Sequence, residues 1–300
     1  MSWLQETDPI KQGHWGEVTS TLLWCERKYV WTKWIAEPVN TLTNLLFIFV
    51  ALYGAFRVVQ QGFPLRLACA SLGLGIVGMG SFLFHMTLKH EAQLLDELPM
   101  IWASSFASWC LLDVTMSTRR RLNPYVLPAV IGATVVFVSA TYVWNKNPVF
   151  HQVAYALIFA YSSINAIIAM THPDSPFALT PAARVARAHA RRLQLVGTGV
   201  FLLGFFVWNI DNIYCGWLRG MRDAVGYPWA VLLEGHGWWH ILTCTGAYLI
   251  LLACEVIVIS YKEHPENISV QYGLLPYVKR VKPDDPRRRL LVEYAQRKAE

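Results

Sequence analysis

Long apolar runs alternate with short polar connections along the chain. The runs occupy residues 38–58, 67–88, 94–114, 125–144, 149–170, 193–214 and 231–261. Each is about twenty residues or longer, which is enough for a helix to cross the hydrocarbon core of a bilayer. The connections hold charges, prolines and glycines, as in residues 60–64, 117–121 and 145–148. The pattern predicts an all-α membrane protein with seven transmembrane helices in a bundle.

Polar segments divide the chain into three parts. We expect an N-terminal polar segment at residues 1–37, a seven-transmembrane domain at residues 38–261, and a polar, basic C-terminal tail at residues 262–300 with a mobile end. The longest connection, residues 171–192, becomes basic in its second half. We expect this half to extend the sixth span as a helix lying against anionic headgroups. Its basic residues are Arg184, Arg187, Arg191 and Arg192.

Composition agrees with a membrane protein. A soluble domain carries about 25% charged residues. This chain has 15% charged and 54% hydrophobic residues, and its mean hydropathy is +0.32. The net charge of +6 belongs to loops and tails, and no nucleic-acid motif accompanies it. Membrane lipids are therefore expected around the protein, and nucleic acid is not an expected partner.

Lysine and arginine are concentrated in the connections on the side of the C-terminus. The positive-inside rule then predicts a cytosolic C-terminus and an N-terminus outside the cell or in a lumen. Cys25 and Cys215 lie in polar segments on the N-terminal side, and they could form a disulfide if that side is oxidising. The other four cysteines fall inside apolar runs and are expected to be inert packing residues.

Three histidines are expected at one level of the membrane. His236 and His240 are four residues apart at the head of the last run, so they share a helix face. His85 ends the second run, and Asp96 begins the third on the same side. Two imidazoles in this register can hold a first-row metal ion, of which zinc fits best. A cluster of His85, Asp96, His236 and His240 is therefore expected, with Ser81 one turn from His85.

Three histidines with an open fourth position are typical of a catalytic zinc ion, which lowers the pKa of bound water towards 7. Asp96 would then accept the proton of the water, and Ser81 would hydrogen-bond a developing oxyanion. The alternatives are a histidine that merely packs in the core and a serine that bonds a neighbouring helix. Glu97 is expected to serve helix pairing, and Glu234 to cap the last helix. Asp211 is either an outer group of the metal site or an interface residue.

Several longer motifs extend this cluster, and together they resemble the alkaline ceramidases, in particular a fungal member of that family. The similarity covers residues 13–261. The motifs are Trp15-Gly, Ser20-Thr, Trp24-Cys-Glu, Ile35-Ala-Glu-Pro-Val-Asn-Thr, Gly78-Met-Gly-Ser-Phe-Leu-Phe-His-Met-Thr-Leu, Gln93-Leu-Leu-Asp-Glu-Leu-Pro-Met, Trp208-Asn-Ile-Asp-Asn and His236-Gly-Trp-Trp-His-Ile-Leu-Thr.

The resemblance implies a seven-span intramembrane zinc amidohydrolase, which hydrolyses the N-acyl bond of ceramide, from the bilayer, to a sphingoid base and a free fatty acid. Phytoceramide or dihydroceramide is the expected substrate, and the endoplasmic reticulum or Golgi the expected location. The resemblance places the zinc ligands at His85, His236 and His240 and the catalytic serine and aspartate at Ser81 and Asp96. It also implies a disulfide that joins the two cysteines in the polar segments, Cys25 and Cys215.

The chain departs from the family at an N-terminal calcium site. The family pattern has an acidic residue where this chain has Leu23 and an amide where it has Lys28; the remaining oxygens fall on the Trp24 carbonyl, Glu26 and Glu37. Calcium requires six to eight oxygen ligands, so the departure puts calcium binding in doubt. Our hypothesis is that the Lys28 ammonium replaces the ion and pairs with Glu26 and Glu37; otherwise these are ordinary solvated charges.

Two other functions are compatible with part of the sequence pattern. A lipid-sensing receptor of the adiponectin-receptor type would use zinc mainly as a structural tie between spans, but the segment before the first span is short for a regulatory domain. An intramembrane metalloprotease would carry glutamate directly after the first histidine of the pair, where this chain has Gly237. Ceramide hydrolysis is the preferred function.

Overall fold

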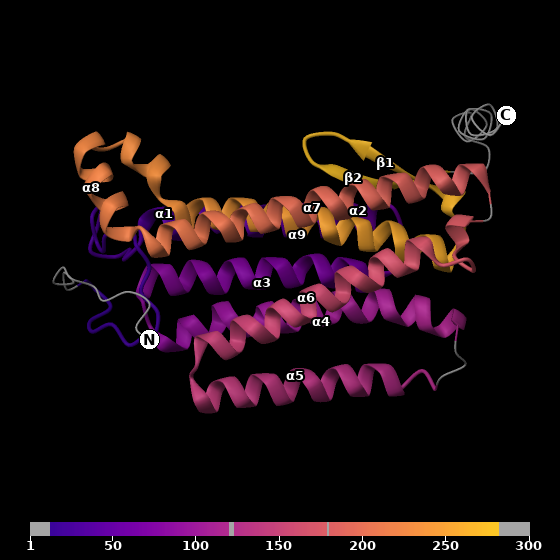
Figure 1. Cartoon of the computed structure of the whole chain (residues 1–300), viewed down its shortest axis with the longest axis horizontal. Coiled ribbons are helices and arrows are strands. Elements are labelled where there is room, and N and C mark those ends of the chain that lie inside the picture. The colour runs from indigo at the N-terminus through magenta and orange to yellow at the C-terminus, as the bar shows by residue number, and fades with distance from the viewer. Residues whose placement is uncertain (1–12, 120–122, 179, 282–300) are drawn as a thin grey trace.

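The computed structural model describes residues 13–119, 123–178 and 180–281, and long helices dominate them (Figure 1). Short 3₁₀ turns occur at Pro176–Ala178, Trp229–Leu233 and Pro265–Asn267. Two strands, β1 (Ile268–Tyr272) and β2 (Pro276–Arg280), follow the last helix. The helices are α1 (Pro38–Thr43), α2 (Leu45–Gln60), α3 (Leu65–Thr87), α4 (His90–Arg119), α5 (Val126–Asn145), α6 (Pro148–Thr171), α7 (Pro181–Ile213), α8 (Cys215–Val225) and α9 (Gly235–Lys262).

Most of the long helices could cross a membrane. Among the described residues, six segments combine the required length and hydropathy: Pro38–Gln60, Leu65–Thr87, Val126–Asn145, Pro148–Thr171, Ala183–Ile213 and Gly235–Lys262. The expected third span, residues 94–114, does form a helix, α4, but α4 is not among the six. Its acidic residues Asp96, Glu97 and Asp113 lower its hydropathy. The all-α membrane class is confirmed, and the count of seven spans stays a prediction.

The sixth and seventh expected spans begin at other residues than the apolar pattern indicated. The basic half of the long connection continues directly into α7, which therefore starts at Pro181, so the predicted helical extension is confirmed. The last span was expected from residue 231, but α9 starts at Gly235 because residues 229–233 form a 3₁₀ turn.

The helices α3 and α4 approach each other closely at a glycine. A Cβ atom on Gly80 would lie 1.8 Å from the carbonyl oxygen of Leu95 and 2.8 Å from the amide nitrogen of Asp96. Only a residue without a side chain allows two helix backbones to come this near, as is common between membrane helices. The approach places the segment of α3 that carries Ser81 and His85 directly against the segment of α4 that carries Asp96.

The N-terminal segment folds back over one end of the bundle. Its backbone bonds to the end of α3, with the Ala36 amide donating to the Met86 carbonyl at 3.0 Å and the Glu37 amide to the His85 carbonyl at 3.0 Å. A disulfide joins Cys25 to Cys215 at the start of α8, as predicted. Residues 13–37 and residues 215–234 thus cover the same end of the bundle (Figure 1). We call these two segments the cap.

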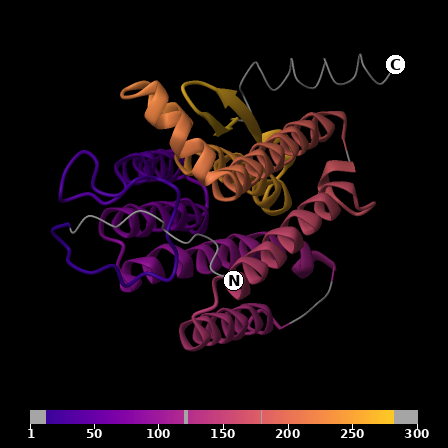
Figure 2. The same ribbon diagram turned by 60° about the vertical axis from the view of Figure 1, so that its left-hand side comes forward.

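A β-hairpin follows α9, in a region where the sequence was interpreted as a polar tail. The strands β1 and β2 pair antiparallel, with Val270 opposite Val278. Ile268, Val270 and Val278 are buried in the main hydrophobic core. The hairpin lies on the side of the bundle opposite α5 (Figure 2). The predicted mobile end of the tail falls within residues 282–300, outside the described residues.

We expect the replacement Gly80→Ala to destabilise the protein by about 1–3 kcal/mol or more, because the new methyl group would overlap the backbone of α4 rather than a movable side chain. Thermal unfolding in detergent measures the effect. Gly132→Ala in α5 is the matched control, since nothing lies within 4 Å of a Cβ atom there. Equal melting temperatures for the two variants would contradict the close crossing of α3 and α4.

Candidate metal centre

Three histidines from two helices meet beneath the cap. His85 lies at the end of α3, and His236 and His240 lie at the start of α9. All three side chains are buried, and one ring nitrogen from each lies within 4.8 Å of the others. The predicted convergence of the second and last spans is therefore confirmed. The spacing suits a single metal ion held among the three imidazoles.

The orientation of two imidazoles is set from outside the cluster. The Nδ1 atom of His85 lies 2.5 Å from an oxygen of Glu37, and the Nε2 atom is buried without a hydrogen-bond partner in the described part of the chain. The Nδ1 atom of His240 lies 2.9 Å from the hydroxyl oxygen of Thr43. When one imidazole nitrogen is hydrogen-bonded in this way, the other is left for a metal.

The third imidazole, His236, packs in an aromatic contact instead. Its ring stacks on Trp24 of the N-terminal segment, with 4.3 Å between the ring centroids. Its Nδ1 atom is buried and has no hydrogen-bond partner among the described residues. Buried polar atoms are costly unless they are satisfied. The unpaired nitrogens of His85 and His236 therefore fit a bound metal, and three imidazoles are the donor set of many catalytic zinc sites.

A buried lysine lies beside the centre, at the position of the degenerate calcium site. The Lys28 ammonium lies 2.6 Å from an oxygen of Glu37. It also donates to the backbone carbonyls of Trp24 at 2.5 Å and Glu26 at 2.7 Å. Lys28, Glu26 and Glu37 are all buried, so they are not ordinary solvated charges. Leu23 is only partly buried and supplies no side-chain oxygen, as the sequence already indicated.

Glu37 and Glu26 make different contacts, and their pKa values are shifted in opposite directions. Burial alone would raise the pKa of Glu37, but the Lys28 ammonium and His85 outweigh it and hold that pKa well below its usual range. The Glu26 carboxylate accepts the Val39 amide at 2.7 Å and the Asn40 amide at 2.8 Å, at the start of α1. Burial and the neighbouring glutamates nevertheless raise its pKa above the ordinary value. Glu37 is therefore the fixed negative charge next to the centre.

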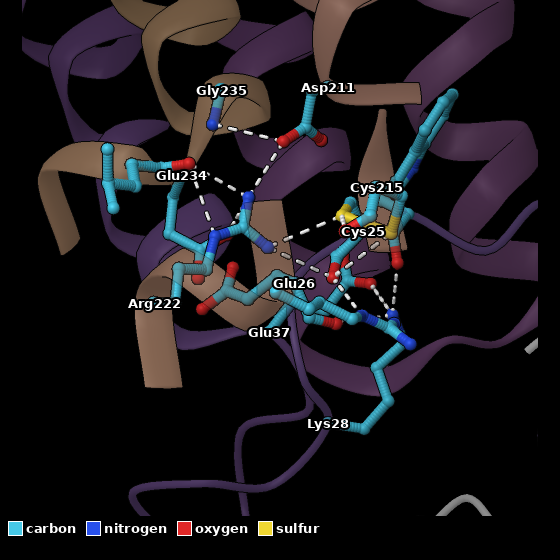
Figure 3. The surroundings of a disulfide bond; sticks show 12 residues. Cys25, Glu26, Lys28, Glu37, Asp211, Cys215, Arg222, Glu234 and Gly235 are labelled. Atoms are coloured by element: carbon cyan, nitrogen blue, oxygen red, sulfur yellow. Dashed lines mark hydrogen bonds and ion pairs between the residues drawn. A yellow bond between two sulfur atoms is a disulfide. The ribbon is translucent and has the colours of Figure 1, made fainter. Parts of the chain in front are cut away.

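The start of α9 is held differently from the expectation. Glu234 occupies the N-cap position of α9, as expected, but within the described part of the chain its side chain makes no capping hydrogen bond. Its carboxylate pairs with Arg222 at 3.1 Å (Figure 3). The Gly235 amide instead donates to Asp211 at 3.2 Å. Burial raises the pKa of Glu234 to about 7, although the Arg222 guanidinium lowers it.

Ser81 and Asp96 lie next to each other where α3 crosses α4. The Ser81 side chain is buried, and its hydroxyl interacts with the Asp96 carboxyl group. Because Ser81 is one turn from His85 on α3, it projects from the same face of the helix as that histidine. The catalytic assignments of Ser81 and Asp96 stay predictions.

The Glu97 carboxylate accepts a hydrogen bond from the Tyr142 hydroxyl of α5 and another, at 3.0 Å, from the Gln93 amide. Helix pairing, its expected task, is confirmed.

Sequence reasoning missed Thr43 as a partner of a candidate ligand. The signal was present, since Asn40, Thr43 and Asn44 place polar side chains three and four residues apart at the head of an apolar run. Polar residues in that register share one helix face and rarely point to lipid. Asn44 indeed lies 3.4 Å from the same His240 nitrogen.

The fold and the centre define a helical membrane protein with a buried three-histidine site at one end of its bundle. Similarity to known proteins identifies the family to which the chain belongs. The sequence model of the Ceramidase family matches residues 16–279. The chain is 36% identical to mouse alkaline ceramidase 3, over 89% of this chain and 95% of that protein. It is also 36% identical to the alkaline ceramidase YPC1 of Saccharomyces cerevisiae, over 81% of this chain and 78% of the relative.

A plant relative, the alkaline ceramidase of Arabidopsis thaliana, is 28% identical over 90% of this chain and 96% of its own length. The chain belongs to the alkaline ceramidase family. It is therefore an enzyme, a hydrolase of that class. The family match extends to residue 279 and so includes most of the hairpin that the sequence pattern did not reveal.

Proposed function

We propose that this protein hydrolyses the N-acyl amide bond of ceramide to a sphingoid base and a free fatty acid, with zinc held by His85, His236 and His240. The observation that carries the proposal is the cluster of three buried imidazoles in a chain of the ceramidase family. Bound zinc supplies Lewis-acid polarisation of a carbonyl and makes water more acidic. Phytoceramide or dihydroceramide is the proposed substrate.

One side chain of α4 is proposed to transfer a proton, and one side chain of α3 to stabilise the oxyanion. A carboxylate oxygen of Asp96 accepts a proton from the attacking water and passes it to the amine that leaves when the C–N bond breaks. The Ser81 hydroxyl donates a hydrogen bond to the carbonyl oxygen as it becomes an oxyanion. The close approach of α3 and α4 at Gly80 supports a shared task, because it holds Ser81 beside Asp96.

The membrane arrangement follows from the helices and the charges. We propose that α4 crosses the bilayer with the six more apolar segments, which makes seven spans enclosing the zinc site. Ceramide then enters from the surrounding lipid. The excess of lysine and arginine on the C-terminal side supports a cytosolic C-terminus, and the disulfide supports an oxidising compartment around the cap. The endoplasmic reticulum or the Golgi would supply that compartment.

The receptor alternative is not favoured. A zinc ion that only tied helices together would need no paired acidic group and hydroxyl on the adjoining helices. Here Ser81 and Asp96 are packed together on the helix that carries His85 and on the helix next to it. The same experiment that tests hydrolysis separates the two functions.

We expect the purified full chain in detergent to release fatty acid from ceramides, and a zinc chelator to abolish the release. His85→Ala should remove metal and activity together, because it deletes one of three ligands. Measurement of zinc content and fatty-acid release from phytoceramide, dihydroceramide and unsaturated ceramide checks this. The exposed His264 offers a control, His264→Ala, which should keep both. A zinc-loaded wild-type protein that cleaves none of the ceramides would refute the proposed reaction.

Asp96→Asn should leave zinc bound and lower turnover roughly a hundredfold or more, since an amide cannot accept the proton of the attacking water. Turnover and zinc content are measured side by side. Asp113→Asn is the matched control on the same helix, where Asp113 pairs with Arg66 far along α4 from Asp96. Near-normal turnover of Asp96→Asn would remove Asp96 from the mechanism.

We also propose that the Lys28 ammonium takes the place of calcium in this chain. An ammonium group has three N–H donors. Its partners among the described residues include the carbonyls of Trp24 and Glu26 and one oxygen of Glu37. A positive charge at this point also disfavours a divalent cation.

Activity should accordingly change less than about twofold when calcium is added or chelated with a calcium-selective chelator. The double variant Leu23→Asp with Lys28→Asn should gain calcium dependence, because it replaces the ammonium by two oxygen-bearing side chains. Strong activation of the wild-type enzyme by calcium would disprove the substitution.

A further inference from the structure

Arg222, a buried residue of α8, binds the chain just before the proposed metal ligand His236 (Figure 3). One terminal nitrogen of the Arg222 guanidinium lies 2.8 Å from the Leu233 carbonyl oxygen, 2.8 Å from Asp211 and 3.1 Å from the Glu234 carboxylate. Its Nε atom donates to the same Leu233 carbonyl at 3.2 Å. The other terminal nitrogen donates to the Cys25 carbonyl at 3.3 Å.

These contacts fix three successive residues. Arg222 holds the carbonyl of Leu233 and the carboxylate of Glu234, and the Asp211 oxygen that it binds also accepts the amide of Gly235. The next residue is His236. With Leu233 to Gly235 held in place, the first turn of α9 has little freedom to move. The imidazole of His236 is therefore kept in a fixed position.

The Arg222 guanidinium also compensates the negative charges of its two neighbouring carboxylates. Asp211 and Glu234 are both buried, and without Arg222 they would place like charges side by side in a poorly solvated site. A buried carboxylate whose charged partner is removed is left uncompensated, and the hydrogen bonds around it rearrange. The planar fork of arginine reaches several acceptors at once, which the single ammonium of lysine cannot do.

We infer that Arg222 is a positioning residue for the metal centre: through Asp211, Glu234 and Leu233 it holds the start of α9 so that His236 can bind the ion. The inference rests on the proposed zinc occupancy of the three histidines. Outer groups of this kind commonly change metal affinity by 10–100-fold when they are removed. A purely structural role, as an anchor of the cap, would instead lower stability and leave the metal centre unchanged once the protein is folded.

The test is metal binding by the full chain in detergent. Arg222→Gln should raise the zinc dissociation constant by 10–100-fold in competition with a chromophoric zinc indicator. It should also alter the visible absorption bands of the cobalt(II)-substituted protein, which report ligand geometry. Arg222→Lys keeps the charge but loses the fork, so its affinity should fall between those of Arg222→Gln and the wild type. Asp223→Asn is the control, because Asp223 is the next residue of α8 and pairs with Arg27 in an exposed contact.

A charge-balanced variant, Arg222→Gln with Asp211→Asn, covers the case in which Arg222→Gln alone does not fold. It removes one positive and one negative charge together, so the buried imbalance is smaller, and it too should bind zinc weakly. Wild-type zinc affinity and an unchanged cobalt spectrum in either folded variant would overturn the inference. Failure of both variants to fold would also overturn it, by making Arg222 a folding residue.

The outcome is separable from that of the proposed reaction. A wild-type protein that binds zinc but cleaves no ceramide would refute the reaction and leave the positioning of His236 testable by affinity and spectrum. Conversely, an active wild-type enzyme whose Arg222→Gln variant binds zinc normally would refute the positioning alone.

Discussion

The carboxylate of Glu37 has no access to solvent, and both of its oxygens are engaged by positively charged or hydrogen-bonding partners. One oxygen lies 2.6 Å from the Lys28 ammonium, and the other lies 2.5 Å from Nδ1 of His85. A buried carboxylate is tolerated only when it is paired in this way. Because Glu37 directly precedes α1, one side chain joins the N-terminal segment, the first span and the histidine at the end of α3.

The other two histidines depend on the cap and the first span in a similar manner. Thr43 of α1 hydrogen-bonds His240, Trp24 stacks on His236, and Arg222 with Asp211 holds the backbone just before His236. Each imidazole is therefore oriented by residues outside its own helix. The Cys25–Cys215 disulfide holds the two segments of the cap together. The cap is thus part of the construction of the centre and more than a cover over it.

The sequence allowed the helices and the histidine cluster to be predicted because both depend on local spacing. A register of four residues puts His236 and His240 on one face, and apolar runs of span length leave little choice but membrane helices. The hairpin had a local signal as well, since Ile268, Val270 and Val278 belong to short alternating stretches. Charges around these residues made the region look like a tail. Only the core against which the hairpin packs reveals it as a folded element.

The partners of the buried charges could not be predicted in the same way. Glu37 and His85 are separated by 48 residues and Asp211 and Arg222 by 11, so their pairing depends on how helices dock. The sequence did indicate that Lys28 and Glu37 belong together, but the Trp24 and Glu26 carbonyls that complete the lysine site are backbone groups. Any residue offers a carbonyl, and so no sequence pattern marks it.

The buried charges of the cap and the proposed metal ion form one electrostatic unit. Among the described residues, the cap buries the carboxyl groups of Glu26, Glu37 and Glu234, and Asp211 adds a fourth at the end of α7. Lys28 pairs with Glu37, Arg222 pairs with Asp211 and Glu234, and Arg219 is a further buried cation of the cap. Neutral imidazoles bring no charge of their own. A divalent ion at the histidines would therefore be stabilised mainly by Glu37, the carboxylate whose pKa stays low and which contacts His85. The cations of the cap repel a divalent ion by their own charge, so any favourable effect that they have on the metal centre must come from the groups that they hold in place.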